Sequence, residues 1–136
     1  MVVEARVSSG IQPELWVGEP RRAVAFYEAA FGATTIHLVG DGDDIVAQLA
    51  VGEAAFWVAP AAQAMKRLDP RAIDGSTCRT LLVVEDPASF VQCAVSAGAT
   101  ERSPVAEEHG WQLGRITDPF GHEWEIGKPL GAWPPD

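Results

Sequence analysis

An internal duplication limits the fold of this chain more than any other feature. Three pairs of segments match at nearly equal offsets. The pairs are residues 31–34 with residues 97–100 (66 positions), residues 19–20 with residues 86–87 (67 positions), and Gly52 with Gly121 (69 positions). Because helix and turn signals recur in the same order, we expect two copies of one supersecondary unit.

Each unit is predicted to contain one helix and four strands. In the first unit, apolar residues recur at helical spacing between Pro20 and Phe31, and Gly32 ends the helix. In the second unit, Asp86 and Pro87 open the corresponding helix. Strand-like runs bounded by glycine and aspartate turns supply the rest. They cover residues 11–17, 34–39, 44–51 and 54–59, and then residues 77–85, 100–102, 111–117 and 122–126.

The predicted fold is a single α+β domain that spans residues 1–136. Two tandem βαβββ units would form a curled eight-stranded mixed sheet around a cleft, with the helices outside. The predicted parts are a first unit at 11–59, a connector at 60–76, a second unit at 77–127 and a proline-rich tail at 128–136. A chain of 136 residues can bury a core of the size that one domain needs.

Charge and composition exclude some partners. The chain has 10 basic and 19 acidic residues, for a net charge of −9, and a negative field repels nucleic-acid phosphates. The same field would attract a cationic small molecule, although it also serves solubility alone. No apolar run approaches the about 20 residues of a membrane helix, and the first residues lack a secretory signal. Cys78 and Cys93 are expected to be buried, reduced thiols, which suits a cytoplasmic protein.

Two segments carry a resemblance to a known family. Residues 23–33 (AVAFYEAAFGA) resemble the first helix, and residues 118–126 (DPFGHEWEI) resemble the last turn and strand, of the glyoxalase/bleomycin-resistance/dioxygenase (vicinal oxygen chelate) superfamily. With the duplication, the resemblance covers about residues 11–127. It implies that metal-dependent relatives chelate a divalent ion with four side chains, from the first and last strands of each unit. The ion would act as a Lewis acid on two neighbouring substrate oxygens.

The four corresponding positions in this chain are Gln12, Phe56, Arg79 and Glu125. Only Glu125 is a good metal ligand, and the charge of Arg79 would repel an ion. Arg79 and Glu125 are instead expected to pair with each other. We therefore expect no bound metal and no cofactor.

Alternation along the strands predicts which other side chains line the cleft. Gln12, Glu14 and Trp16 share one face of the first strand, and Arg79 shares a face with Leu81. A polar Gln48 in an apolar strand would face the cleft or a buried partner. Tryptophans would form a stacking wall for a flat or cationic ligand, or fill the core. The predicted lining is Gln12, Glu14, Trp16, Gln48, Phe56, Trp57, Arg79, Leu81, Trp111 and Glu125.

Two functions remain open on the sequence. In the first, the protein is not an enzyme but binds a small molecule without metal, as bleomycin-resistance proteins do, and sequesters an antibiotic or metabolite in the cleft of a homodimer. In the second, it is a lyase, isomerase or dioxygenase of the same superfamily. Glu125 would then serve as base or metal anchor, with Gln12 as a weak second ligand. A neighbouring Arg79 would lower the pKa of Glu125, against what a base needs.

Overall fold

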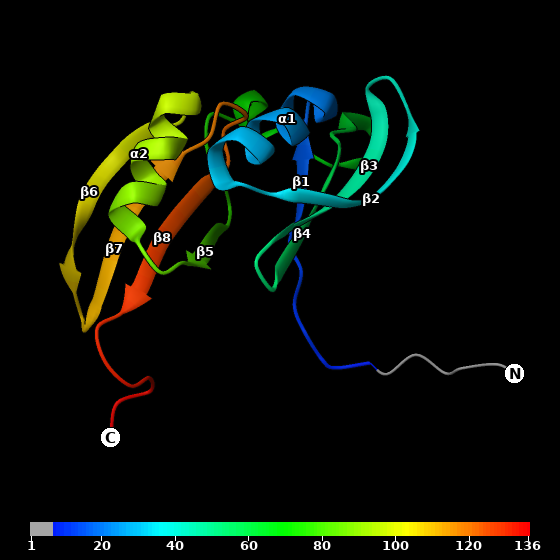
Figure 1. The fold of residues 1–136 in the computed structure, drawn as a ribbon. Helices are drawn as coiled ribbons and strands as arrows, with labels where there is room; N and C mark the ends of the chain where they lie inside the picture. The colour runs from blue at the N-terminus through cyan, green and yellow to red at the C-terminus, as the bar shows by residue number, and fades with distance from the viewer. Residues whose placement is uncertain (1–6) are drawn as a thin grey trace, which may run out of the picture.

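The computed structural model describes residues 7–136, and its elements repeat in one order (Figure 1). The first unit contains β1 (Glu14–Val17), α1 (Pro20–Phe31), β2 (Thr34–Asp41), β3 (Asp44–Val51) and β4 (Ala54–Pro60). The second unit contains β5 (Arg79–Val83), α2 (Pro87–Ala97), β6 (Thr100–Glu108), β7 (Trp111–Thr117) and β8 (Glu123–Pro129). Between them, the connector forms two short 3₁₀ turns, at Gln63–Met65 and Pro70–Ala72. The predicted α+β class with tandem βαβββ units is confirmed.

The eight strands divide into two four-stranded sheets with the same internal order. The first sheet runs β1-β4-β3-β2, and the second runs β5-β8-β7-β6. In each sheet the first strand pairs in parallel with the fourth, and the remaining ladders are antiparallel. β1 and β5 are therefore edge strands, and the expected eight-stranded sheet is instead two sheets side by side.

Local sequence explains why the helices begin and end where the duplication predicts. Proline stands at the first turn of both helices, where its missing N–H needs no partner. The Asp86 side chain also accepts a hydrogen bond from the Ser89 backbone N–H (3.2 Å). Gly32 (φ 64°) and Gly98 (φ 126°) end the helices in backbone conformations that other residues adopt only with strain.

Both helices pack on one face of the sheets and against each other, so the two units share one core (Figure 1). The Trp124 ring of β8 lies 4.9 Å from Phe31 of α1 and 5.3 Å from Phe56 of β4 (centroid distances). Tyr27 of α1 lies 5.1 Å from Phe56. Each buried aromatic ring contributes about 1.5–3 kcal/mol through the removal of apolar surface from water.

Several details differ from the predictions. Phe56 is only 4% exposed and faces the helices, so its predicted place in the cleft is wrong. Cys78 and Cys93 are both exposed, free thiols, so their predicted burial is wrong: Cys78 lies just before β5, and Cys93 lies on the exposed side of α2. β6 is longer than predicted and β8 continues to Pro129, two residues into the predicted tail, because β7 pairs with both strands along their length.

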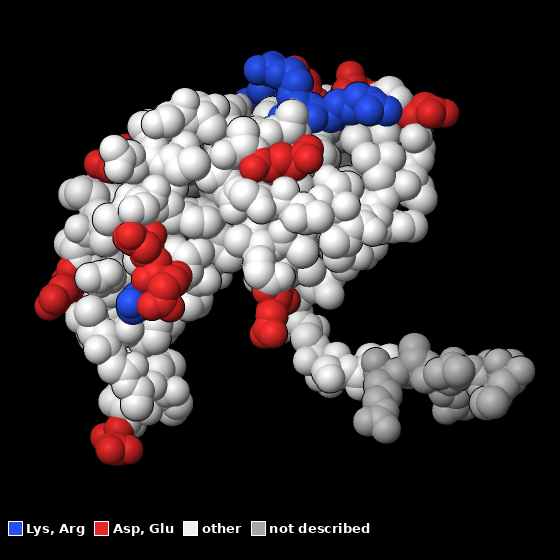
Figure 2. Space-filling view, viewed as in Figure 1, with Lys and Arg blue, Asp and Glu red and all other residues white. Residues whose placement is uncertain are grey.

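The surface reflects the acidic composition. In Figure 2, lysine and arginine side chains gather mainly over the start of α1, whereas acidic side chains are spread over the rest of the visible face. Arg21 and Arg22, both exposed, belong to that first helical turn. Within residues 7–136, the structure has no helix that is long and apolar enough to cross a membrane.

Candidate functional site

The candidate site lies on the faces of the two sheets opposite the helices, which we call the open face. Alternation decides which side chains reach it. In β1, Leu15 and Val17 are buried against the helices, so Glu14 and Trp16 point the other way. In β8, Trp124 and Ile126 are buried, so Glu125 belongs to the open face. The sheet edges β1 and β5 face each other across the middle of the site (Figure 1).

Neutral groups satisfy one another on the open face of the first unit. Gln12 Oε1 accepts hydrogen bonds from Gln48 Nε2 (3.0 Å) and from Trp57 Nε1 (2.8 Å). His37 stands opposite Gln48 in the β2–β3 ladder, and its ring lies 6.5 Å from the ring of Trp57. The three predicted residues Gln12, Gln48 and Trp57 are thus brought together.

Charged groups occupy the open face of the second unit. Glu125 Oε2 lies 3.4 Å from Arg79 Nη2 and 3.0 Å from Arg115 Nη2. Arg115 also contacts Glu108 through Nη1 (3.0 Å). The hydrogen bond to Glu108 is the main reason that the pKa of Arg115 is raised, with Glu125 adding to it. The predicted Arg79–Glu125 pair is therefore present, within a larger network.

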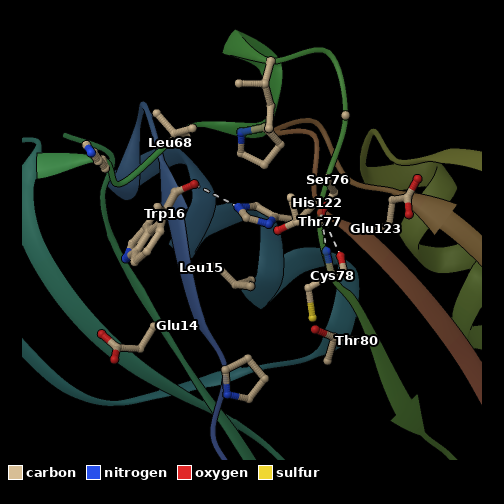
Figure 3. A pocket seen from close by; sticks show the side chains of 15 residues that line it. Glu14, Leu15, Trp16, Leu68, Ser76, Thr77, Cys78, Thr80, His122 and Glu123 are labelled. Atoms are coloured by element: carbon tan, nitrogen blue, oxygen red, sulfur yellow. Dashed lines mark hydrogen bonds between the residues drawn. The ribbon is translucent and has the colours of Figure 1, made fainter. Parts of the chain in front are cut away.

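A groove of about 430 Å³ separates the two edge strands (Figure 3). Its walls come from β1, the connector, the start of β5 and the turn before β8. Glu14 and Trp16 lie on one side, whereas Thr80 and Glu123 lie on the other, with Leu68 of the connector above. Volumes of this order suit drug-sized ligands in proteins.

The polar groups of the groove include one contact between the two units. His122 Nε2 lies 2.9 Å from the Trp16 carbonyl oxygen, a contact that joins the second unit to β1 (Figure 3). A carbonyl oxygen can only accept, so Nε2 carries the proton. Two exposed carboxylates, Glu14 and Glu123, and one ammonium group, Lys66, line the groove.

The other predicted residues lie outside the groove. Leu81 is exposed on β5, directly opposite Glu125 in the ladder. Trp111 is the first residue of β7, and its ring centroid lies 5.4 Å from that of Trp133 in the tail. Trp16, Trp57 and Trp111 stand on three different strands, and Trp111 belongs to the other sheet, so these tryptophans do not share one wall.

Arg115 and Asp118 received no role in the sequence analysis. Arg115 was detectable, because it alternates with Trp111 and Leu113 and so shares the face predicted for Trp111. Asp118 precedes Pro119 at the end of β7, a setting in which aspartate often caps a turn.

Asp118 is buried (4% exposed), and four donors surround its carboxylate. Tyr27 Oη and Trp124 Nε1 (3.0 Å) donate to Oδ2, while the backbone N–H groups of Phe120 (2.9 Å) and His122 (3.0 Å) donate to Oδ1. Burial, and then the Asp118 charge, raise the pKa of Tyr27 well above its ordinary value. Because Tyr27 belongs to α1 and Asp118 to the second unit, this contact fastens the two units together.

The residues at the expected chelating positions do not fit a metal ion. By register, the first-unit position falls on Trp57, which has no ligand atom, and Gln12 Oε1 already accepts two N–H donors. Arg79 is a cation, and two guanidinium groups surround Glu125. In the described residues, no three His, Cys, Asp or Glu side chains come together as a metal site requires.

Proteins of two mycobacteria are similar to this chain in sequence. A protein of Mycobacterium bovis described as uncharacterized is 29% identical over 130 residues, which cover 91% of this chain and 86% of the relative. A protein of Mycobacterium tuberculosis with the same description is also 29% identical and has 76% of its length covered.

Solved structures share the fold. TioX from Micromonospora sp. ML1 superposes with a TM-score of 0.69 at 23% identity, covering 91% of this chain and 98% of TioX. A gene product of Arabidopsis thaliana gives a TM-score of 0.65 at 29% identity, covering 90% and 98%. A bleomycin-binding protein, solved with bleomycin, gives a TM-score of 0.67 at 20% identity, covering 89% and 98%.

The family profile of the glyoxalase-like domain matches residues 14–127, which run from the first residue of β1 to β8. The matched span contains nearly all of both βαβββ units, most of the groove and most of the open face. The chain belongs to the glyoxalase-like domain family.

Proposed function

We propose that this protein binds a small, flat or cationic molecule without a metal and sequesters it, as a cytoplasmic homodimer of the resistance type. The observation that carries the proposal is the state of the four chelating positions. They form two pairs, Gln12 with Trp57 and Arg79 with Glu125, in which the oxygen atoms already accept hydrogen bonds or contact guanidinium groups, so that these four positions offer no ligand set for an ion.

The groove supports the choice of ligand. Glu14 and Glu123 supply negative charge, and Trp16 supplies an aromatic surface on which a flat cation could stack. The net charge of −9 would raise the local concentration of such a cation. The likeness to a bleomycin-binding protein is consistent with sequestration in this fold.

Chemistry on Glu125 is disfavoured by its surroundings. A general base has to accept a proton, but two guanidinium groups already contact Oε2 of the Glu125 carboxylate. The groove also lies beside β1 and β5, and Glu125 is not among the residues that line it.

Binding of proflavine, a flat cation, tests the proposal. The five tryptophans provide the fluorescence signal, and acridine, which is flat but uncharged at mildly alkaline pH, provides the comparison. We expect saturable binding of proflavine, weaker binding of acridine, and at least a fivefold loss of affinity in Glu14→Gln and in Trp16→Leu. Glu28→Gln, on the exposed side of α1, is the matched charge control.

Two outcomes would overturn the proposal. One is binding of proflavine that is equal in Glu14→Gln, Trp16→Leu and the Glu28→Gln control, which would place the dye elsewhere. The other is mass-spectrometric detection of a converted compound after long incubation, which would favour an enzyme over a sequestering protein.

A further inference from the structure

A second, smaller cavity of about 220 Å³ lies on the second unit beside the groove. Arg79 of β5, Arg102 of β6 and Arg115 of β7 line it together with Glu123. Three of the ten basic residues of an acidic chain thus converge from three strands on one small space. A cavity of this size is too small for a drug-sized molecule and suits a single polar group.

The protein's own contacts use only part of the donor capacity of these arginines. A guanidinium group has five N–H donors. Arg79 contacts Glu125 through one nitrogen, Nη2, and its side chain is 44% exposed. Arg102 donates from Nε to Thr117 Oγ1 (2.9 Å), and within residues 7–136 it has no carboxylate partner. Most donors of Arg79 and Arg102 therefore stay available to a ligand.

Arg115 differs from the other two because it is held in place. Glu108 and Glu125 contact it from two sides, which fixes the plane of its guanidinium group. Prearranged guanidinium groups bind carboxylate and phosphate oxygens through paired hydrogen bonds. Among residues 7–136, Glu123 is the one acidic side chain that lines the cavity, and it also lines the groove, so it marks the boundary between the two spaces.

We propose that this cavity binds a carboxylate or phosphate group of a small molecule. A ligand that occupied both spaces would place an anionic group among the three arginines and its flat or cationic part beside Glu123 and Trp16. The proposal goes beyond the function proposed above and does not depend on it, since a simple anion can occupy the cavity alone.

Arginine side-chain NMR signals of the full ¹⁵N-labelled chain test the proposal. Benzoate and inorganic phosphate are the probes, benzamide is the uncharged comparison, and ionic strength is held constant. We expect saturable shifts of the Nε–Hε signals of Arg79, Arg102 and Arg115 with at least one anion. A response to benzoate alone assigns the site to carboxylates, and a response to phosphate alone assigns it to phosphate groups.

Variants connect the signal to the cavity. Arg102→Gln should weaken anion binding at least tenfold and leave the fold intact, because Arg102 neutralises no carboxylate in the described structure. Arg21→Gln, an exposed change of the same charge on α1, should leave the affinity unchanged. The proposal is overturned by shifts that do not saturate, by equal shifts with benzamide, or by an Arg102→Gln protein that binds as tightly as the parent. Proflavine binding in the groove is measured separately, so either proposal can fail alone.

Discussion

On the open face of the first unit, an amide oxygen of Gln12 accepts from an amide and an indole; on the open face of the second unit, a carboxylate of Glu125 lies between two guanidinium groups. These positions correspond in the two units. Gln12 lies just before β1 and Arg79 begins β5, the first strand of each unit. Trp57 and Glu125 lie on β4 and β8, the last strand of each unit. Strand order is also the same in both sheets. The duplicated backbone therefore leaves the chemistry of the open face free to diverge.

The reason for this freedom lies on the other side of the sheets. Helix ends, turn glycines and the aromatic core fix the backbone of both units, and none of them includes an open-face side chain. A substitution on the open face alters local hydrogen bonds or charges without changing the path of the strands. The following predictions test whether the open face can change without affecting the helix-covered side of the sheets.

The largest effect is expected where the two units are joined. Asp118→Ala removes the acceptor for Tyr27 and Trp124 and leaves both donors unpaired in the core. We expect the free energy of unfolding to fall by about 3 kcal/mol or more. Urea denaturation measures it, with Asp86→Ala, an exposed helix cap, as the control that should lose about 1 kcal/mol. A loss for Asp118→Ala no larger than for the control would mean that the units are not joined here.

The next effect separates neutral from charged chemistry. Glu125→Leu leaves Arg79 and Arg115 without this carboxylate and should cost about 2 kcal/mol. Gln12→Leu removes hydrogen bonds near the surface and should cost about 1 kcal/mol. Raising the salt concentration from about 0.01 M to about 1 M should reduce only the first loss, because salt screens charge repulsion. If both substitutions lowered the free energy of unfolding equally and independently of salt, the contrast between the open faces of the two units would be contradicted.

A smaller effect concerns pH and Tyr27. Its folded pKa is raised by burial, so its contribution to stability is complete below the ordinary tyrosine pKa and is lost as the pH rises toward the folded value. Above pH of about 10, the free energy of unfolding should fall by about 1.4 kcal/mol per pH unit more than in Tyr27→Phe. Tyr27 is the only tyrosine, so its ultraviolet absorbance follows its ionisation directly. Titration near the ordinary pKa while the protein stays folded would contradict the burial argument.

The smallest effect belongs to the tail. Trp133 packs edge-on against Trp111 and covers its ring. Within residues 7–136, no tail residue covers Trp57 of the first unit in this way. Because Trp133 is half exposed, Trp133→Ala should cost only about 0.5 kcal/mol. It should also shift tryptophan emission to longer wavelength by exposing Trp111. Unchanged emission would indicate that the tail does not cover Trp111 in solution.

The duplicated turn and helix signals predicted the fold, because each is a local backbone requirement that the sequence displays. The position of Phe56 was wrong for a related reason. Glu125 lies four residues after Gly121, whereas the corresponding Trp57 lies five residues after Gly52. One extra residue in a strand moves the counted position to the opposite face of the sheet.

Interactions across strands were harder to predict than the strands themselves. The contact of Arg115 with Glu108 depends on the β6–β7 register, which is interrupted by two irregularities. Asp118 and Tyr27 are 91 positions apart and meet only because the two units share a core. Spacing along the chain contains no information about either contact.

Metal content of the purified protein tests whether the chelating positions hold an ion. The protein is purified without chelators or added metal, and zinc, nickel, iron and manganese are measured per subunit by elemental analysis. We expect far less than one equivalent of each, because Gln12 is bonded to Trp57 and Glu125 is paired with Arg79 at the chelating positions. Close to one equivalent of any of these metals, lost in Glu125→Leu, would contradict this expectation.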